Sequence, residues 1–323
     1  MKELEKDSAT KWTEKSLPDL SGKVIIITGA NSGTGFSATK FMSAKGATVI
    51  MACRNPEKAE KALQSIKNEN PSAKLDFIQL DLGDLASVKK FAAAFKEKYA
   101  LLDILINNAG VAQTPDLKTK DGFEMQMGIN HLGHFALTSY LVERLANTKN
   151  SRVVTVGSMN GEQGEMNFDN IFFEGEYQAM TAYNQSKLAT HLFAYELGKR
   201  FENAGLGIES LAANPGFIKS NILKDNADTT RSFGFKLIFG FFETLLAMSP
   251  NQGSLSIMRA ATDRTLNNGD FISPMKAGGM RGLPKLVTLT NTAYNDENAK
   301  KLWGVSDELT GVRYEFNGIR YRT

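Results

Sequence analysis

The sequence predicts an α/β fold in which a parallel sheet carries helices on both faces, and three observations support this prediction. Short runs rich in β-branched residues alternate along the chain with longer helix-forming stretches, which is the pattern of repeated strand–helix–strand units. The first run, Val24–Ile27, is apolar at every position, as expected of a strand buried on both faces. A glycine-rich turn at residues 28–35 follows this strand and leads into a helix, an arrangement that can bind the pyrophosphate of a dinucleotide.

The glycine-rich turn is the first candidate site. Its glycines are spaced G-x-x-x-G-x-G, which differs from the G-x-G-x-x-G of the commonest dinucleotide fingerprint. Glycine lets the backbone turn tightly and lets a pyrophosphate approach the N-terminus of the next helix, where free N–H groups and the helix dipole favour negative charge. Such turns also occur without a ligand, so the spacing alone leaves both interpretations open. The candidate cofactor-binding residues here are Gly29, Asn31, Ser32, Gly33, Thr34 and Gly35.

The other elements follow from the same alternation. Pro56 stands where the second helix begins, a position at which its missing N–H matters little. Ligands in such a sheet bind beyond the carboxyl ends of the strands, so polar residues after the strands are candidates for a site. We expect further strands at 47–52, 75–80, 102–106, 152–156 and 208–212, and helices at 36–42, 56–67, 84–98, 122–146 and 181–201.

The composition is that of an ordinary globular protein. The 323 residues are 42% hydrophobic and 23% charged, which is enough to bury a sizeable core. The 38 basic and 35 acidic residues give a net charge of +3, and no block of like charge indicates a nucleic-acid partner or a membrane surface. The single cysteine, Cys53, excludes an intramolecular disulfide and suits a reducing compartment.

The domain organisation is simple. Residues 1–20 alternate Lys and Glu with small polar residues, so we expect no signal peptide, no membrane anchor and a cytoplasmic location. No repeat or linker interrupts the remainder. The prediction is a loose N-terminal segment at 1–20 and a single dinucleotide-binding catalytic domain at 21–323, with an apolar insertion at 225–249 and a C-terminal extension at 276–323.

The most apolar stretch of the chain, Phe233–Met248, lies in this insertion. It is shorter than the about 20 residues that span a bilayer, and Lys236 and Glu243 interrupt it. Three interpretations compete: a wall of an apolar substrate pocket, a contact in a homo-oligomer, and a patch for peripheral membrane contact. We favour the first and leave the other two open.

Tyr183 and Lys187 are four residues apart, about one helical turn, and so share a helix face. A tyrosine has a pKa of about 10 and is a poor base at neutral pH, but a nearby positive charge lowers that pKa. The pair is a candidate for proton transfer, although Tyr-x-x-x-Lys is also common on solvated helices. Ser158 follows a predicted strand, where its hydroxyl could hold a carbonyl or alkoxide oxygen or cap a turn.

Asn130 lies inside the long helix predicted at 122–146, where Asn is a mediocre helix former, and this favours a specific hydrogen-bonding role. The three histidines lack a carboxylate or cysteine pattern that would complete a metal site. We therefore expect no bound metal. Cys53 is expected to be a small buried residue rather than a nucleophile. The histidines assigned to packing or hydrogen bonding are His131, His134 and His191.

Together these residues resemble the short-chain dehydrogenase/reductase family over about residues 22–275. The resemblance implies a Rossmann-type doubly wound sheet of about seven parallel strands in the order 3-2-1-4-5-6-7, with the last strand near residues 270–273. The motifs that carry it are Thr28-Gly29-x-x-x-Gly33-x-Gly35, Asp81-Leu82, Asn107-Asn108-Ala109-Gly110, Asn130, Ser158, Tyr183-x-x-x-Lys187 and Pro215-Gly216-x-Ile218-x-Ser220.

The resemblance also implies roles for these residues. Tyr183 would be the acid or base, and Lys187 would lower its pKa and hold the nicotinamide ribose. Ser158 would orient the substrate oxygen, and Asn130 would anchor a water-mediated proton path to solvent. The remaining implied cofactor contacts are Asp81 and Leu82 at the adenine, Asn108, Ala109 and Gly110 at the ribose side, and Pro215, Gly216, Ile218 and Ser220 at the nicotinamide.

The choice of cofactor can be argued from charge. A carboxylate after the second strand pairs with the ribose hydroxyls of NAD, whereas an arginine accommodates the 2′-phosphate of NADP. The second strand here ends Met51-Ala52-Cys53-Arg54-Asn55, without an acid. Arg54 can grip a phosphate in a bidentate way, although a solvated loop arginine is the plainer alternative. The sequence therefore predicts NADP(H).

Within the family, the chain most resembles the branch of retinol dehydrogenases and protochlorophyllide reductases. The resemblance rests on residues 51–54, 130–135 and 301–311. Asn184 and Gln185 stand where the pigment reductases typically have other residues, so double-bond reduction is the lesser alternative. We expect a carbonyl reductase or alcohol dehydrogenase that acts on a small apolar substrate. A non-catalytic NADP(H)-binding scaffold or redox sensor is the alternative from another class.

Overall fold

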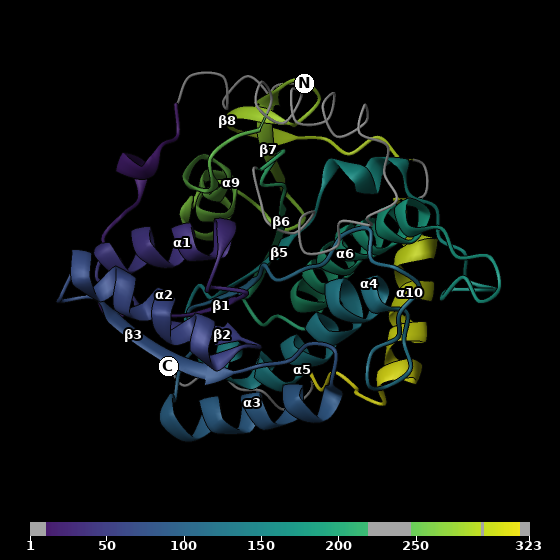
Figure 1. Cartoon of the computed structure of the whole chain (residues 1–323), viewed down its shortest axis with the longest axis horizontal. Coiled ribbons are helices and arrows are strands. Elements are labelled where there is room, and N and C mark those ends of the chain that lie inside the picture. Colours follow the sequence, from purple (N-terminus) through teal and green to yellow (C-terminus); the bar gives the residue numbers. More distant parts are fainter. Residues whose placement is uncertain (1–10, 219–246, 292–293, 317–323) are drawn as a thin grey trace.

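The computed structural model describes residues 11–218, 247–291 and 294–316, which form one eight-stranded sheet with helices on both faces (Figure 1). The strand order is β3-β2-β1-β4-β5-β6-β7-β8, and every neighbouring pair is parallel except β7 and β8. The strands are β1 Val24–Thr28, β2 Thr48–Cys53, β3 Lys74–Gln79, β4 Ile104–Asn107, β5 Arg152–Val156, β6 Glu209–Ala213, β7 Phe271–Lys276 and β8 Arg281–Val287.

The predicted doubly wound fold, with seven parallel strands in the predicted order, is confirmed, and the sheet has an eighth strand that was not predicted. β8 turns back from β7 and pairs with it antiparallel at the edge of the sheet. Its sequence contains Pro284, which argues against a strand in the middle of a sheet but is tolerated at an edge, where one side needs no hydrogen-bond donor.

The sheet divides the core into two layers, one on each of its faces. Successive side chains of β1 point to opposite faces, so Ile25 and Ile27 contact the first layer and Ile26 contacts the second. Both faces of the sheet are therefore buried, as the apolar strands predicted. One layer contains α1 Gly33–Ala44, α2 Pro56–Glu69 and α9 Pro250–Thr262, and the other contains α3 Leu85–Lys98, α5 Gly133–Ala146 and α6 Ala179–Asn203.

The single helix predicted at 122–146 is divided into three parts. A short turn, α4 Met125–Met127, leads into a π-helical turn, η3 Gly128–Leu132, and then into α5. π-helical turns widen the helix locally and are frequent at functional sites. Asn130 lies in this widened turn, where its side chain is free to bond outside the helix.

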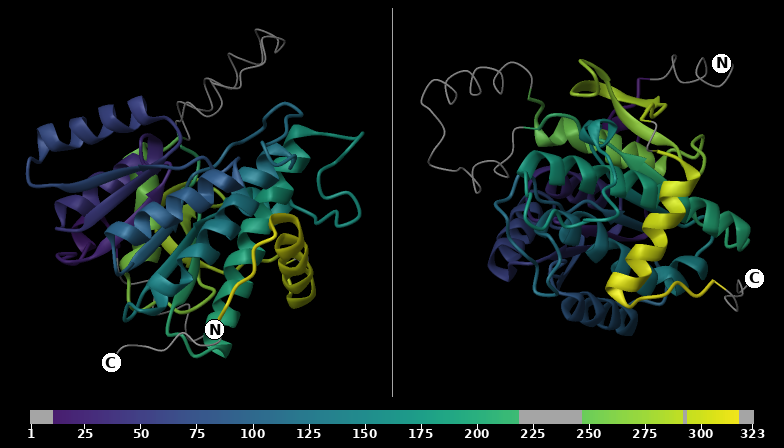
Figure 2. Two further views of the ribbon diagram at one scale, coloured as in Figure 1. Left: turned by 90° about the horizontal axis from the view of Figure 1, so that it is seen from below. Right: turned by 90° about the vertical axis from the view of Figure 1, so that its right-hand side faces the viewer.

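The end of the described chain packs on the outside of the helical layer. α10, Asp296–Thr310, lies along α6, as Figures 1 and 2 show in yellow. Trp303 of α10 is buried, with its ring centroid 5.1 Å from Phe135 and 4.6 Å from Tyr314. Nε2 of His131 lies 2.7 Å from Oγ of Ser306. The predicted C-terminal extension is therefore part of the fold.

The N-terminal segment differs from its prediction where the structure describes it. Trp12, Leu17 and Leu20 are buried in the same core as α1, so residues 11–20 are packed rather than loose. The apolar insertion predicted at 225–249 falls outside the described residues except for 247–249. Within the ranges that are described, none of the helices is both long and apolar enough for a membrane crossing.

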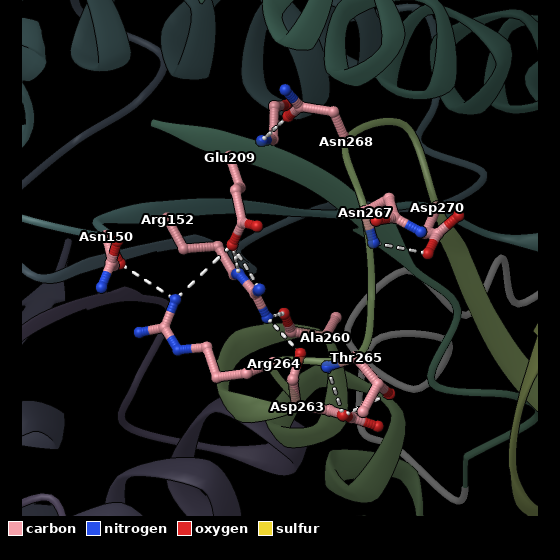
Figure 3. A network of polar contacts seen from close by, with 11 residues as sticks. Asn150, Arg152, Glu209, Ala260, Asp263, Arg264, Thr265, Asn267, Asn268 and Asp270 are labelled. Atoms are coloured by element: carbon pink, nitrogen blue, oxygen red, sulfur yellow. Dashed lines mark hydrogen bonds and ion pairs between the residues drawn. The ribbon is translucent and has the colours of Figure 1, made fainter. Parts of the chain in front are cut away.

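A partly buried ion pair joins β5, β6 and the end of α9 at the amino end of β5. Figure 3 shows Arg152 pointing toward Glu209 on β6, with Nε 2.8 Å from Oε2. Nη1 of Arg152 also donates to the backbone oxygens of Ala260 (2.8 Å) and Asp263 (2.9 Å), at the end of α9. The Arg152 side chain is fully buried, and it fixes α9 to the sheet at the edge opposite the carboxyl ends of the strands.

Candidate active site

α6 brings the predicted proton-transfer pair to the end of β5. Nζ of Lys187 donates to the backbone oxygen of Val156 at 3.2 Å and lies 5.8 Å from the centre of the Tyr183 ring. Ser158 follows β5 by two residues, and its side chain lies close enough to the hydroxyl of Tyr183 to affect the pKa of that hydroxyl. The structure thus gathers Ser158, Tyr183 and Lys187 at the carboxyl end of the central strands.

The pKa of Tyr183 runs opposite to the expectation from its neighbouring lysine. Burial raises the pKa of Tyr183 above its ordinary value, and the neighbouring hydroxyl of Ser158 offsets only part of this effect. Burial also lowers the pKa of Lys187 to about 8. Both shifts have the same cause, because a poorly solvated site disfavours the charged form of each group.

Ser158 caps the turn that follows β5, one of the two roles that its sequence position allows. Its hydroxyl accepts the backbone N–H of Asn160 at 3.2 Å, which caps the short 3-10 turn η4, Met159–Gln163. The same hydroxyl donates to Oδ1 of Asn160 at 3.2 Å, and Nδ2 of Asn160 donates to Oδ1 of Asn184 at 3.1 Å. Sequence reasoning missed Asn160, since its contact with Asn184 joins two segments that are distant along the chain.

Asn130 ties the π-helical turn to its surroundings. Its side chain exchanges two hydrogen bonds with the backbone of Val111, at 2.8 and 3.0 Å, and Nδ2 also donates to Ser186 on α6 at 2.9 Å. This matches the specific hydrogen bonding predicted for Asn130. Because its side chain is occupied by protein partners, Asn130 acts here as a link between η3, α6 and the loop after β4.

Thr28 and His134 form a second link, which the sequence did not reveal. Nδ1 of His134 lies 3.1 Å from the backbone oxygen of Asn130, which can only accept, so Nδ1 carries the proton. Nε2 then accepts from the hydroxyl of Thr28 at 2.9 Å. Thr28 in turn accepts the backbone N–H groups of Asn108 and Ala109, both at 2.8 Å. Burial lowers the pKa of His134 to about 4, which keeps the ring neutral.

The glycine-rich turn has the form that a pyrophosphate requires. Gly29 has φ of +66°, and a Cβ on Gly35 would lie 2.5 Å from the backbone oxygen of Gly29, so the turn is closed too tightly for a side chain there. Among the described residues, the side chain of Ser32 makes no capping hydrogen bond at the start of α1. The first N–H groups of α1 therefore keep the donors that an anion would use.

Asn108 and Thr34 hold this turn together. Nδ2 of Asn108 donates to the backbone oxygen of Thr28 at 2.8 Å, and the hydroxyl of Thr34 donates to Oδ1 of Asn108 at 3.0 Å. A Cβ on Gly110 would lie 3.6 Å from Nζ of Lys187. The end of β4 therefore connects the turn with the catalytic candidates, and the Asn108 side chain is occupied within the protein.

The residues predicted at the adenosine side lie after β2 and β3. Arg54 is exposed, and within the described part of the chain its guanidinium pairs with no carboxylate. The carboxylate of Asp81 accepts the backbone N–H of Gly83 at 3.0 Å, while Leu82 is buried. Cys53 is buried beneath the turn, and burial raises its pKa to about 11, so it is a packing residue as predicted.

The turn after β6 is built around Asn214. Nδ2 of Asn214 donates to Ser273 and to the backbone oxygen of Gly279, both at 2.9 Å, and its Oδ1 accepts the N–H of Gly216 at 3.0 Å. Ile218 then pairs with Met248 in an isolated bridge. Pro215, Gly216 and Ile218 are thus held beside β7, whereas Ser220 lies outside the described residues.

No cluster suited to a metal ion occurs among the described residues. Each histidine instead has a hydrogen-bond partner: Ser306 for His131, Thr28 and Asn130 for His134, and the backbone N–H of Ser158 for His191. The packing and hydrogen-bonding roles predicted for the histidines agree with these contacts.

Comparisons with known proteins agree with this geometry. A sequence model of the short chain dehydrogenase family matches residues 23–231. Retinol dehydrogenase 12 of Mus musculus is 36% identical over 298 residues, which cover 92% of this chain and 89% of that protein. Polyprenol dehydrogenase of Homo sapiens is 33% identical over 307 residues, which cover 93% of this chain and 89% of that protein.

A solved structure extends the comparison to three dimensions. The crystal structure of a protein from Mycobacterium Paratuberculosis is 35% identical, has a TM-score of 0.78, and covers 95% of this chain and 100% of its own. The likeness in sequence and in fold therefore runs over almost the whole chain. The protein belongs to the short-chain dehydrogenase/reductase family, in its retinol-dehydrogenase-like branch.

Proposed function

We propose that this protein is an NADP(H)-dependent oxidoreductase that interconverts a carbonyl and an alcohol on a fairly apolar substrate. The observation that carries the proposal is the meeting of Ser158, Tyr183 and Lys187 next to the glycine-rich turn. Oxidation and reduction of alcohols and carbonyls fit the family. The names of the relatives, retinol dehydrogenase and polyprenol dehydrogenase, support an apolar alcohol or aldehyde as the substrate class.

The nicotinamide, when bound, supplies or accepts the hydride. In the direction of reduction, the hydroxyl of Tyr183 donates its proton to the carbonyl oxygen, and the hydroxyl of Ser158 donates a hydrogen bond to the same oxygen. A pKa raised by burial keeps the proton on Tyr183 at neutral pH, which suits the donor role. Lys187 lies close enough to stabilise the phenolate that is left behind.

The preference for NADP(H) rests on Arg54. Its exposed guanidinium stands one residue after β2, and this part of the chain offers no carboxylate that would pair with the ribose hydroxyls of NAD. The tight turn at residues 29–35 and the uncapped start of α1 fit the pyrophosphate of either cofactor. Charge beside the ribose therefore decides between the two cofactors.

The proposal is tested with the purified full-length chain. NADPH binding is measured by fluorescence titration, and turnover is followed by NADPH absorbance with a panel of aldehydes, ketones and alcohols that includes retinoids, polyprenols and steroids. We expect saturable NADPH binding and turnover of apolar aldehydes. Protein that binds NADPH but turns over no member of the panel would instead be a nucleotide-binding scaffold or sensor.

A further inference from the structure

The helix face that carries Tyr183 and Lys187 continues to a third residue, His191. The spacing of four residues places all three side chains on one ridge of α6. Each lies at the end of β5: Lys187 donates to the backbone oxygen of Val156 (3.2 Å), and the hydroxyl of Tyr183 lies near the side chain of Ser158. Nε2 of His191 accepts the backbone N–H of Ser158 at 3.3 Å. Ser158 thus lies beside two side chains of α6, those of Tyr183 and His191.

The His191 ring is enclosed on several sides. A Cβ on Gly157 would lie 2.3 Å from Nε2, and a Cβ on Gly161 would lie 2.6 Å from Cε1, so only glycine leaves room for the imidazole on both sides of Ser158. The ring of Phe271 contacts it edge-on, with centroids 4.9 Å apart. The side chain is 1% exposed. The imidazole therefore cannot shift without moving the turn that carries Ser158.

The hydrogen bond defines the tautomer of His191. Because the backbone N–H of Ser158 can only donate, Nε2 is unprotonated and Nδ1 carries the proton. Within the described part of the chain, Nδ1 is buried and has no hydrogen-bond partner. A buried donor without a partner lowers stability. An apolar residue of similar size would avoid that penalty, so stability alone does not account for a histidine here.

We propose that His191 is a positioning residue for the reaction, which holds the backbone of Ser158 so that its hydroxyl meets both Tyr183 and the substrate oxygen. This inference rests on the proposed function, because the orientation of Ser158 matters only if Ser158 contacts the reacting oxygen. The bond to the backbone fixes the turn, and the turn fixes the direction of the hydroxyl.

A double-mutant cycle tests the inference. His191→Leu should lower kcat about tenfold, the equivalent of one lost hydrogen bond, while the dissociation constant for NADPH and the melting temperature do not fall. His191→Gln, which restores an acceptor near the position of Nε2, should recover kcat to within about twofold of wild type. In a Ser158→Ala background, His191→Leu should cause no further loss, because its effect passes through Ser158.

The control is Ser210→Ala, which removes a buried hydrogen bond to the backbone oxygen of Ala194 on the same helix (2.8 Å) without touching Ser158. It should leave kcat unchanged. The positioning role would be overturned if His191→Leu lowered kcat as much in the Ser158→Ala background as in wild type. A tenfold loss of kcat in Ser210→Ala would also overturn it.

A second readout does not depend on turnover. The chain has only three histidines, so ¹⁵N NMR can assign each tautomer, and His191 should be a neutral Nδ1–H ring. An Nε2–H ring at position 191 would contradict the inference even in an active enzyme. If the wild type turns over no carbonyl or alcohol, the proposed function fails, and the positioning role of His191 fails with it. The tautomer of His191 shows independently whether its hydrogen bond to the backbone of Ser158 exists.

Discussion

The hydroxyl of Thr28 lies 2.9 Å from Nε2 of His134, so one hydrogen bond joins the strand before the glycine-rich turn to the helix beyond Asn130. The same hydroxyl accepts two backbone N–H groups from the end of β4, those of Asn108 and Ala109. A single side chain thus fixes the relative positions of β1, β4 and α5 at the carboxyl edge of the sheet.

Thr28→Val should therefore reduce both stability and cofactor affinity. The substitution keeps the shape of the side chain but leaves two backbone donors and Nε2 of His134 without their partner, which should cost about 3 kcal/mol in the free energy of unfolding. Urea unfolding and NADPH titration measure the two effects. Thr262→Val, which loses one hydroxyl contact to a helix carbonyl on α9, is the control and should cost less than about 1 kcal/mol. Equal effects of the two substitutions would contradict the linking role of Thr28.

Tyr183→Phe should abolish most turnover without weakening cofactor binding. The substitution removes the proton donor while leaving the ring in place, so we expect kcat to fall by at least about a hundredfold. NADPH titration should give a dissociation constant close to that of wild type. Tyr195→Phe, on the same helix but bonded to Asp296 at the surface, is the matched control and should keep its activity. Undiminished kcat in Tyr183→Phe would rule out the role assigned to its hydroxyl.

Lys187→Met should stabilise the protein while lowering its activity. Burial lowers the pKa of Lys187 from 10.5 to about 8, so between these values the unfolded chain binds the extra proton and stability rises with pH. Below pH 8 the buried charge carries the full free-energy penalty, about 3 kcal/mol from the shift in the pKa of Lys187, and Lys187→Met removes it. The difference in unfolding free energy between this variant and wild type should shrink from pH 8 to 10. Lys61→Met, which removes a lysine from the exposed face of α2, is the matched control.

Arg54→Asp should reverse the choice of cofactor. The wild type should have the higher kcat/KM with NADPH, because a guanidinium attracts the 2′-phosphate, whereas the variant should prefer NADH, because a carboxylate pairs with the ribose hydroxyls. Steady-state kinetics with both cofactors measure the ratio. Lys67→Asp makes the same change of charge at the far end of α2 and should not change the ratio of kcat/KM with NADPH to kcat/KM with NADH. A wild type that works equally well with NADH would refute the preference.

Arg152→Met should unfold more easily yet remain catalytically normal. The substitution removes the donor for two backbone oxygens, while Glu209 stays partly exposed and keeps Arg264 as a partner. It should cost about 2–3 kcal/mol in the free energy of unfolding. The network lies at the amino end of β5, away from Ser158, so kcat at a permissive temperature should not change. Arg264→Met, at the exposed rim of the same network, should cost less than about 1 kcal/mol.

Much of this structure could be predicted because its signals are local. Buried parallel strands appear in the sequence as short runs of β-branched residues, and their alternation with helices fixes the order of β1 to β7. β8 was not predicted because Pro284 makes its sequence look unlike a strand, although proline is tolerated in an edge strand. The break at Gly128–Leu132 escaped because the apolar pattern continues through it. Both misses concern departures from regular geometry.

The candidate site was predictable in its members but not in its environment. Ser158, Tyr183 and Lys187 could be proposed from motif and position, whereas the direction of the Tyr183 pKa depends on burial, which a sequence does not display. Asn160, His134 and His191 escaped for a related reason. Their partners lie on other elements, so no spacing along the chain reveals the contacts.

The contact between His131 and Ser306 spans 175 positions along the chain. During synthesis the ribosome must deliver α10 before the segment beside Asn130 acquires this partner and before Trp303 covers Phe135. The Rossmann core can assemble earlier, from residues already outside the exit tunnel. A chain that ends before α10 would therefore lack the contacts that Ser306 and Trp303 make with the helical segment around Asn130.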